Sequence, residues 1–469
     1  MAVAKLAMAA PEISQPRLQR LNQRDQRKGN YVLYWMQQAQ RADYNDALEY
    51  AIQSANSLNQ PLLAVFGLMH DYPEANQRHY AFMLEGLRET QSMLRERGIQ
   101  LIVKLGAPPQ VALAVGEQAS IIICDRGYLR HQQQWRDALA TRATCTVIQV
   151  ETDAIVPVET TSDKQEIAAR TIRPKIQKRI ESYLQRPVTQ QVKKDSLGLR
   201  FDNSAGFSNQ DRELDLDNAL AQLNIDRSVA RSHYFKGGAS PARALLHAFL
   251  SKNFDRYADK RSDPGADAGS HMSPYLHFGQ IAALEIALAV RQQQGADAAR
   301  AAFLEEMIVR RELSVNFVHF QPDYDKFTCL PAWAKSTLHK HRRDRREHAY
   351  DLTQLKDANT HDRYWNAAMR EMKITGYMHN TMRMYWGKKI LEWSATPEQA
   401  FGNALTLNNK YFLDGRDANS YANVAWLFGL HDRPFPERLI YGTVRCMTAG
   451  GLERKYDIEA YVQRIAALD

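Results

Sequence analysis

The sequence predicts an N-terminal α/β domain with a doubly wound, parallel, Rossmann-like sheet, a long linker, and an all-helical C-terminal domain. Three observations predict this fold class. Short apolar runs alternate with amphipathic stretches over residues 29–155, which is typical of strand–helix units around a parallel sheet. The pattern weakens over residues 156–239. Helical periodicity then dominates residues 240–469.

Five apolar runs are the predicted strands of the α/β domain. They begin at Tyr31, Pro61, Ile99, Ser120 and Cys145, and they read YVLYWM, PLLAVFGL, IQLIVKLG, SIIICD and CTVIQV. Between them lie helical patterns such as DYNDALEYAIQSA and HYAFMLEGLRETQSMLRERG, and the latter ends on Gly98, a suitable helix C-cap. Pro108 and Pro109 suit the start of the next helix. Because no GxGxxG or P-loop follows the first strand, neither kind of nucleotide site is predicted.

The linker over residues 156–239 is polar and poor in apolar periodicity. It ends at Ser240-Pro241, where a helix N-cap residue and a proline open the C-terminal domain. Helical patterns are predicted there over residues 240–257, 280–293, 296–318, 361–394 and 397–404.

Length and composition suit a globular protein that binds a polyanion. The chain has 469 residues, 44% of them apolar, which is enough for two or three compact units. It carries 61 basic and 53 acidic residues, for a formal net charge of +8, and such a balance favours a phosphate-rich partner where the charge is clustered.

Sorting and metal-binding signals are weak in this sequence. Residues 1–28 end in a basic, Gln-rich run that is typical of a disordered tail and follows an apolar stretch too short for a signal peptide. No apolar run reaches the roughly 18 residues of a membrane span, so we expect a cytoplasmic protein. The 4 cysteines lack zinc-type spacing, which favours free thiols, and no metal site is predicted.

Tryptophans cluster in the predicted helical domain. Four of the 7 lie within 62 residues, at Trp365, Trp386, Trp393 and Trp426. Trp386 and Trp393 are seven residues apart and share a helix face with Arg383. Such residues are often core aromatics, but they also suit a row of oxidisable indoles that leads from a buried redox cofactor to the surface. Spacing alone does not separate the two interpretations.

Two loops suggest polar binding sites. Gly269, Ser270 and His271 precede SPYLHFGQ, where backbone N–H groups and hydroxyls suit either phosphate oxygens or an ordinary helix cap. The run LDGRDANSYANVAW, residues 413–426, places two carboxylates and an arginine in four positions. Buried charges need partners, and MHNTMRMYWGKKILEW provides candidates in Asn380 and Arg383.

These motifs, in this order, resemble the FAD-binding domain of the photolyase/cryptochrome family, and in detail its class II cyclobutane pyrimidine dimer photolyases. The resemblance is carried by SPYLHFGQ, EEMIVRRELSVNF, HDRYWNA, MRMYWGKKILEW, LDGRDANSYANVAW and HDRPF, by YWM at Tyr34, and by AARTIRPKIQKR at Ala168. It covers about 440 of the 469 residues. It implies a light-driven carbon–carbon lyase that flips a pyrimidine dimer out of double-stranded DNA and splits it with an electron from photoexcited, reduced FAD.

The resemblance also implies which residues bind the cofactor. They are Tyr257, Ser270, His271, Met272, Ser273, Arg311, Asn380, Arg383, Asp414, Gly415 and Asn419. Among them, Arg383 and Asp414 are expected to form an ion pair beside the flavin ring, where a fixed cation stabilises reduced, anionic flavin. Asn408 resembles the residue near flavin N5, although a simple turn residue in LNNKY is the alternative.

Further roles follow from the same resemblance. Trp386, Trp365 and Trp393 resemble the proximal, middle and distal donors of a photoreduction chain. Glu306 resembles the acid that hydrogen-bonds the dimer, with its neighbour Glu305 as the alternative.

The expected substrate contacts come from the same comparison. Trp426 resembles the aromatic residue that packs against the flipped dimer, and Arg261, Arg433 and Arg445 are the expected DNA contacts. Some class II members have a tryptophan at the position of Arg310, and this arginine suits a base, a phosphate, or a salt bridge to Glu306 or Glu312. The basic run over residues 335–348 suits either DNA or a solvated face.

Several expectations remain open. A cryptochrome-like photoreceptor and a (6-4) photolyase are the alternative functions. The α/β domain is expected to hold a deazaflavin, a folate, a flavin or no antenna chromophore, and the sequence does not determine which. We expect a monomer that binds dimer-containing double-stranded DNA and no membrane, and that associates with the nucleoid in a prokaryote.

Overall fold

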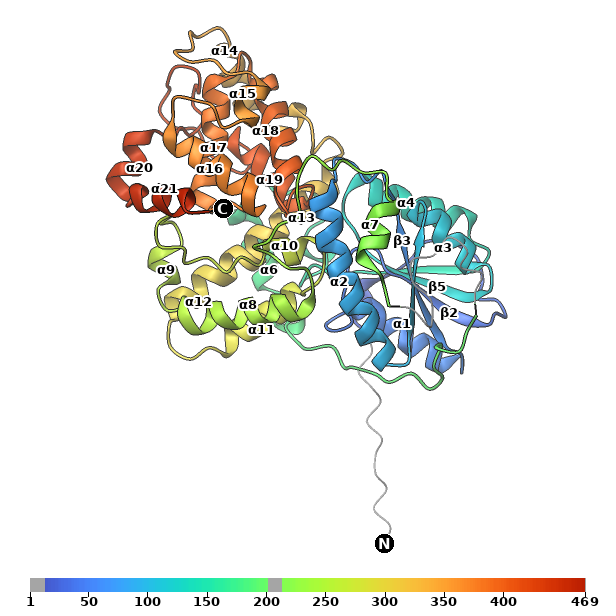
Figure 1. Ribbon diagram of the computed structural model, residues 1–469. Helices are drawn as coiled ribbons and strands as arrows, with labels where there is room; N and C mark the ends of the chain where they lie inside the picture. Colours follow the sequence, from blue (N-terminus) through green and yellow to red (C-terminus); the bar gives the residue numbers. More distant parts are fainter. Residues whose placement is uncertain (1–12, 201–212, 469) are drawn as a thin grey trace.

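The computed structural model describes residues 13–200 and 213–468, and it places an α/β domain beside a helical domain (Figure 1). The α/β domain contains a six-stranded sheet with the strand order β1-β6-β5-β2-β3-β4. Its strands are β1 (Leu18–Arg20), β2 (Tyr31–Trp35), β3 (Leu62–Leu68), β4 (Gln100–Leu105), β5 (Ala119–Asp125) and β6 (Thr146–Val150). All pairs among β2 to β6 are parallel, so the predicted parallel sheet is confirmed.

Helices cover both faces of this sheet because side chains alternate along each strand. In β2, Val32 and Tyr34 join the core under α1 and α2, whereas Leu33 and Trp35 join the core under α3 and α4. Every residue of β2, β3 and β5 is buried, as expected for strands covered on both faces. These helices are α1 (Asp46–Ser57), α2 (Gln77–Glu96), α3 (Pro108–Gly116) and α4 (Arg130–Arg142).

The predicted disordered tail over residues 1–28 is wrong for the part that the structure describes. After a short 3₁₀ turn (η1, Gln15–Arg17), β1 pairs antiparallel with β6 and closes that edge of the sheet. Arg17 is buried and donates hydrogen bonds to the backbone carbonyls of Glu151, Ala154 and Ile155. The polar composition hid this strand, because its stability comes from a distant partner strand and not from its own sequence. Residues 1–12 lie outside the described part.

The predicted linker contains short elements that pack on both domains. They are α5 (Val158–Thr161), α6 (Ala169–Gln177), η2 (Ile180–Ser182) and α7 (Leu216–Gln222). Ile172 and Ile176 of α6 join a core of the helical domain, while α7 lies against α2 of the α/β domain (Figure 1). Residues 201–212 of this segment lie outside the described part.

The C-terminal domain is helical, as predicted. Its elements are α8 (Ala239–Lys252), α9 (Tyr257–Lys260), α10 (Ser273–His277), α11 (Ala283–Gln292), α12 (Asp297–Leu304), the π-helix η3 (Glu305–Arg310), α13 (Arg311–Phe320), η4 (Phe327–Cys329), α14 (Ala332–Lys340), α15 (Leu352–Lys356), α16 (Arg363–Thr375), α17 (Asn380–Trp393), α18 (Pro397–Tyr411), α19 (Ala418–Leu427), α20 (Ala449–Lys455) and α21 (Ile458–Ala466). Across the described ranges, no helix is both long and apolar enough to cross a membrane.

Two of the predicted helical patterns are divided in the structure. The pattern over residues 361–394 is two helices, because Gly376 ends α16 with a φ of 82°, a conformation that favours glycine. The pattern over residues 296–318 is interrupted by η3, and π-helical segments often occur at functional sites.

Candidate active site

Three of the clustered tryptophans form a contiguous buried series. Trp386 and Trp393 come from α17 and Trp365 from α16, and each is at most 2% exposed. The indole nitrogen of Trp365 donates a 3.0 Å hydrogen bond to the backbone oxygen of Trp386. The ring centroids of Trp365 and Trp393 are 5.6 Å apart. The series therefore runs from Trp386 through Trp365 to Trp393.

The far end of the series is covered by two residues that sequence reasoning missed. The rings of Tyr350 and His361 lie 5.2 and 5.4 Å from the ring of Trp393, and the Tyr350 hydroxyl is 2.7 Å from His361 Nδ1. His361 is exposed, so this pair connects the buried tryptophans to the protein surface. Both residues lie in loops whose polar composition carried no signal of this packing.

Arg383 and Asp414 form the predicted ion pair. Arg383, on α17, contacts both carboxylate oxygens of Asp414 at 3.2 Å, and their side chains are only 14% and 11% exposed. The guanidinium carbon of Arg383 lies 3.8 Å from the ring centroid of Phe412, and the same ring is 6.2 Å from that of Trp386. Arg383 and Trp386 therefore meet one aromatic ring, so the ion pair lies next to the start of the tryptophan series.

Asn408 lies inside α18, and the alternative of a turn residue is wrong. Its side chain is buried at 2% exposure and donates hydrogen bonds to Asn409 Oδ1 at 3.0 Å and to Ser420 Oγ. Gly415 passes directly over this helix, since a Cβ there would lie 2.8 Å from the backbone oxygen of Asn408. The chain thus brings the loop of Asp414 close to a neutral amide.

The loop before α10 holds a second polar cluster. His271 has a φ of 54°, and its Nε2 lies 3.2 Å from Asp267, which lowers the pKa of that carboxyl to about 2. Its Nδ1 is buried with no hydrogen-bond partner among the described residues. The His271 ring meets the Tyr377 ring edge-to-face, with centroids 4.6 Å apart, and the charges of Arg383 and Asp414 act on Tyr377 electrostatically. Tyr377 therefore connects this loop to the Arg383–Asp414 pair.

Not every predicted cofactor residue joins this group. Arg311 is buried at the domain interface, where its guanidinium donates to the Asp153 carboxylate at 2.8 Å. Arg311 and Asn419 line a small cavity together with Asp153. Asn380 is exposed in the first turn of α17.

Glu306, Arg261 and Tyr257 meet beside the π-helix. Arg261 Nη1 donates to Glu306 Oε1 at 2.9 Å. The ring of Tyr257 packs on Phe303, and burial raises the pKa of its hydroxyl to about 12. The predicted acid, one predicted DNA contact and one predicted cofactor residue thus share one site.

Glu305 has different partners. It accepts a bidentate pair of hydrogen bonds from Arg173 of α6, at 3.0 and 2.7 Å, and it lies 3.2 Å from Arg310 Nε. Arg310 is therefore paired with Glu305 and with neither Glu306 nor Glu312, the two partners that the sequence suggested.

A large cavity of about 1420 Å³ is lined by Arg173 and Arg310, whereas Glu305, Glu306 and Arg261 are not among its lining residues. Trp426, Arg310, Arg433 and Arg445 line it. The Arg445 guanidinium lies 5.6 Å from the Trp426 ring and also bonds Asp432 at 3.1 Å. Four of the predicted substrate-binding residues therefore face one space.

A buried lysine contacts the ring of Trp426. Lys388 is fully buried, and burial lowers the pKa of its ammonium group to about 7. Its Nζ donates to the backbone oxygen of Leu427 and lies 5.3 Å from the Trp426 ring. No sequence pattern indicated this contact.

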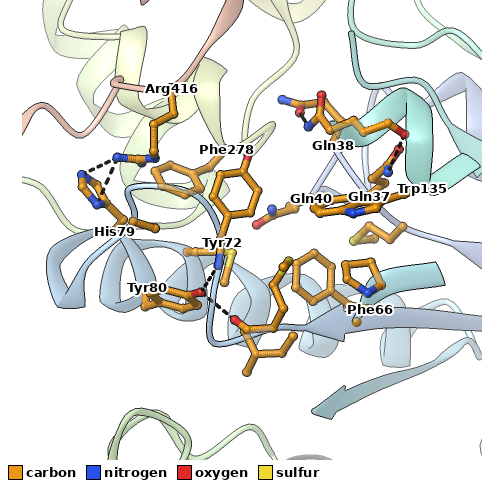
Figure 2. Close-up of a pocket in the computed structure, with 18 of the residues that line it drawn as sticks. Gln37, Gln38, Gln40, Phe66, Tyr72, His79, Tyr80, Trp135, Phe278 and Arg416 are labelled. Carbon is orange, nitrogen blue, oxygen red and sulfur yellow. Dashed lines mark hydrogen bonds between the residues drawn. The ribbon is translucent and has the colours of Figure 1, made fainter. Parts of the chain in front are cut away.

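A second pocket lies between the domains, at the carboxyl ends of β2 and β3 (Figure 2). Aromatic rings and glutamine amides form most of its wall. They include Trp35, Phe66, Tyr72, Tyr80, Trp135, Phe278, Gln37, Gln38 and Gln40. Figure 2 shows Arg416 at one wall, where its guanidinium bonds His79 and is only 2% exposed.

The basic run over residues 335–348 borders the large cavity without lining it, since Lys340 pairs with Glu437, which lies between the lining residues Pro436 and Arg438. Its lysines, arginines and histidines do not line that cavity, which on this element ends at Trp333. Acidic groups also neutralise part of the run: His341 lies 2.7 Å from Asp344 and 2.8 Å from Glu437. Its role in DNA binding stays a prediction.

Comparisons with known proteins agree with this arrangement. The model of the DNA photolyase family matches residues 32–193. The deoxyribodipyrimidine photo-lyase of Methanothermobacter thermautotrophicus is 48% identical over 94% of this chain and 96% of its own length. The proteins of that name from Potorous tridactylus and Arabidopsis thaliana are 35% and 36% identical, each over 93% of this chain, and over 81% and 89% of their own lengths.

Solved structures show the same fold. An archaeal photolyase from Sulfolobus tokodaii, determined with two FAD molecules, superposes with a TM-score of 0.68 at 16% identity, covering 92% of this chain and 89% of its own. A bacterial class III photolyase from Agrobacterium tumefaciens gives a TM-score of 0.69 at 17% identity, covering 93% and 86%. At such identities the structures establish the fold, whereas the sequence relatives establish the family. This chain belongs to the DNA photolyase family.

Proposed function

We propose that this protein is a class II photolyase, which splits cyclobutane pyrimidine dimers in DNA by light-driven electron transfer from reduced FAD. The observation that carries the proposal is the buried series Trp386–Trp365–Trp393, which begins beside the Arg383–Asp414 pair and ends beneath Tyr350. A row of neighbouring buried tryptophans with one end at a fixed cation and the other at the surface suits the reduction of a buried flavin.

The residues present fit FAD. Arg383 supplies a fixed positive charge beside a redox ring, and Asp414 holds that charge in place. The buried His271 Nδ1 offers a polar contact in the loop before α10, whose N–H groups and hydroxyls suit phosphate oxygens. Asn408 offers a neutral amide, which can hydrogen-bond the ring without acting as a strong acid. When bound, FAD supplies the electron that enters the dimer after light absorption.

We assign DNA recognition to the large cavity. Trp426 provides an aromatic face for a flipped dimer, and Arg433 and Arg445 provide charge for the adjacent phosphates. Glu306 is the carboxyl we assign to the dimer, because it has one arginine partner, Arg261, whereas Glu305 lies between two, Arg173 and Arg310. A dimer pairs poorly in the duplex, so flipping it out costs less than flipping an intact base.

We propose that the pocket of Figure 2 holds a planar antenna chromophore. Ligands of open α/β sheets bind outside the carboxyl ends of the strands, and this pocket has that position and an aromatic wall. The buried Arg416 guanidinium at its wall favours an electron-rich or anionic ring. An absorption band in addition to that of FAD, lost on Phe66→Trp substitution, would support this assignment.

Light-dependent repair tests the proposal directly. Protein loaded with FAD and reduced chemically is mixed with duplex DNA that contains one defined thymine dimer, then illuminated, with a dark control and a (6-4) photoproduct duplex in parallel. We expect repair of the dimer only, and only in light. Repair of the (6-4) product would contradict the class assignment, and FAD-loaded protein that repairs neither lesion would favour a photoreceptor.

A further inference from the structure

We propose that residues 165–173 of the interdomain linker are part of the DNA-binding surface, where Arg173 and Arg310 hold a phosphate of the damaged duplex. The inference rests on the proposed function and extends it to a segment of the linker that packs on the helical domain. It makes the linker a recognition element as well as a connection.

The segment forms part of the wall of the large cavity. Six of its residues line the same space as Trp426 and Arg310: Gln165, Ile167, Ala168, Ala169, Arg170 and Arg173. Helix α6, which begins at Ala169, contacts the π-helix that carries Glu306. Any duplex that places a dimer against Trp426 therefore passes close to this segment.

The cavity wall is strongly cationic. Its charged lining residues are Arg170, Arg173, Arg310, Arg433, Arg438, Arg445, Arg454, Lys455 and, as the carboxylate among the described lining residues, Asp432. Asp432 is already paired with Arg445 at 3.1 Å. A cluster of this kind attracts a polyanion, because each bound cation releases counterions from the phosphates. Two of its arginines come from the linker.

Glu305 organises the proposed phosphate contact. It binds Arg173 through two hydrogen bonds and Arg310 through a 3.2 Å ion pair, and the bond from Arg173 lowers the pKa of its carboxyl. One carboxylate between two guanidinium groups leaves a net single positive charge. Arg173 and Arg310 are 35% and 47% exposed, and a guanidinium has five N–H donors, so each keeps donors for a phosphate oxygen.

Two further features of the segment suit a nucleic acid. Ile167 is 66% exposed beside the cavity, and an exposed isoleucine at this place suits apolar contact with a deoxyribose or an unstacked base. The N-cap residue Ala168 and the first helical residues Ala169 and Arg170 of the nine-residue helix α6 line the cavity, so the first turn of α6 adds a partial positive charge there.

A purely structural role for Arg173 makes a different prediction. If Arg173 only holds the linker against the π-helix, then replacing it changes the stability of the protein. The affinity for DNA and its salt dependence then stay the same as in the wild type. The pair formed by Arg291 and Glu181 is a matched control, since it also joins the linker to the helical domain. Its arginine is 39% exposed, it lies 3.1 Å from the glutamate, and it does not line the cavity.

Equilibrium binding of a dimer-containing duplex, measured by fluorescence anisotropy from about 50 to 200 mM salt, tests the inference with FAD-loaded protein. Loss of one phosphate contact reduces the slope of log K against log salt by about 0.9, so the affinity change across this range becomes smaller by about 3.5-fold. We expect this for Arg173→Gln and not for Arg291→Gln. Ile167→Ser should weaken binding with an unchanged slope.

The outcomes separate the inference from the proposed function. FAD content and the melting temperature first establish that each variant is folded. An Arg173→Gln protein with the wild-type slope and affinity overturns the inference. A loss of affinity with an unchanged slope overturns it as well. In both cases, light-dependent repair by the wild type leaves the proposed function standing. A wild-type protein that neither prefers nor repairs dimer DNA overturns the proposed function itself.

Discussion

A buried carboxyl at the domain interface makes the stability of this protein depend on pH. Glu312 of α13 is 4% exposed, and its Oε1 accepts hydrogen bonds from the backbone nitrogens of Ile155 and Val156, at 2.7 and 3.2 Å. Burial raises the pKa of Glu312 from 4.5 to about 7, because the two hydrogen bonds and the nearby Arg311 only partly compensate for the lost hydration. The carboxyl is therefore neutral in the folded protein at mildly acidic pH.

The sign and size of the effect follow from proton linkage. Between pH 4.5 and about 7 the folded state binds a proton that the unfolded state has released, so stability falls as pH rises. Each pKa unit is worth about 1.36 kcal/mol, and the difference between 4.5 and about 7 amounts to about 3.4 kcal/mol. This contribution is fully present below pH 4.5 and lost above pH 7.

The substitution Glu312→Gln should remove this dependence, since the amide oxygen can still accept both backbone hydrogen bonds without ionising. We expect the variant to match the wild type near pH 4.5 and to be more stable by about 3 kcal/mol at pH 7.5. Urea unfolding at the two pH values measures the difference, and hydrogen exchange of residues 151–158 locates it. Glu159→Gln is the control. Burial raises the pKa of Glu159, but Arg126 and His319 outweigh burial and hold this pKa below 4.5, outside the range from pH 4.5 to 7.5 that is compared. A stability difference between Glu312→Gln and wild type that is equal at both pH values would refute this reasoning.

Three further predictions concern the site and its packing. Trp386→Phe should abolish or strongly slow photoreduction of FAD and leave repair intact once FAD is reduced chemically; unchanged photoreduction, followed by transient absorption, would exclude Trp386 from the chain. Glu306→Gln should lower the repair yield at unchanged FAD content, whereas Glu305→Gln should change DNA affinity more than yield, and the reverse result would exchange the two assignments. Gly387→Ala should destabilise the protein by about 1–3 kcal/mol in thermal unfolding, because the new Cβ would lie 2.1 Å from Leu427 Cδ1, and an unchanged melting temperature would contradict this close packing of α17 on α19.

Local pattern was sufficient for most of the architecture. The strands that begin near Tyr31, Leu62 and Ala119 are runs of apolar residues long enough to be buried on both faces, and such runs have few other stable arrangements. It was insufficient for β1, where Leu18–Arg20 is a polar run that gains its hydrogen bonds from β6, 128 or more residues away in the chain. It was also insufficient at Gly376, where one helical pattern conceals two helices.

The site residues also include some that local pattern predicted and some that it missed. The spacing of Arg383 and Trp386 predicted one helix face, and both side chains do meet the ring of Phe412. Tyr350 and His361, which cover the last tryptophan, lie in loops and gave no pattern to read. The motifs thus predicted Arg383, Trp386 and Asp414, and missed Tyr350 and His361, which lie in loops outside the tryptophan-bearing helices and pack on Trp393.

The sequence by itself determined most of the order of strands and helices along the chain, the helical domain with its tryptophans, and the family that the chain resembles. Only the tertiary structure decided which ion-pair partners Glu305, Glu306 and Arg310 have. Adjacent glutamates are indistinguishable as letters, but Glu305 meets Arg173 from 132 positions earlier in the chain, whereas Glu306 meets Arg261. The physical reason is that an ion pair depends on distance in space, which the folding of a linker across the cavity sets and which no local periodicity encodes.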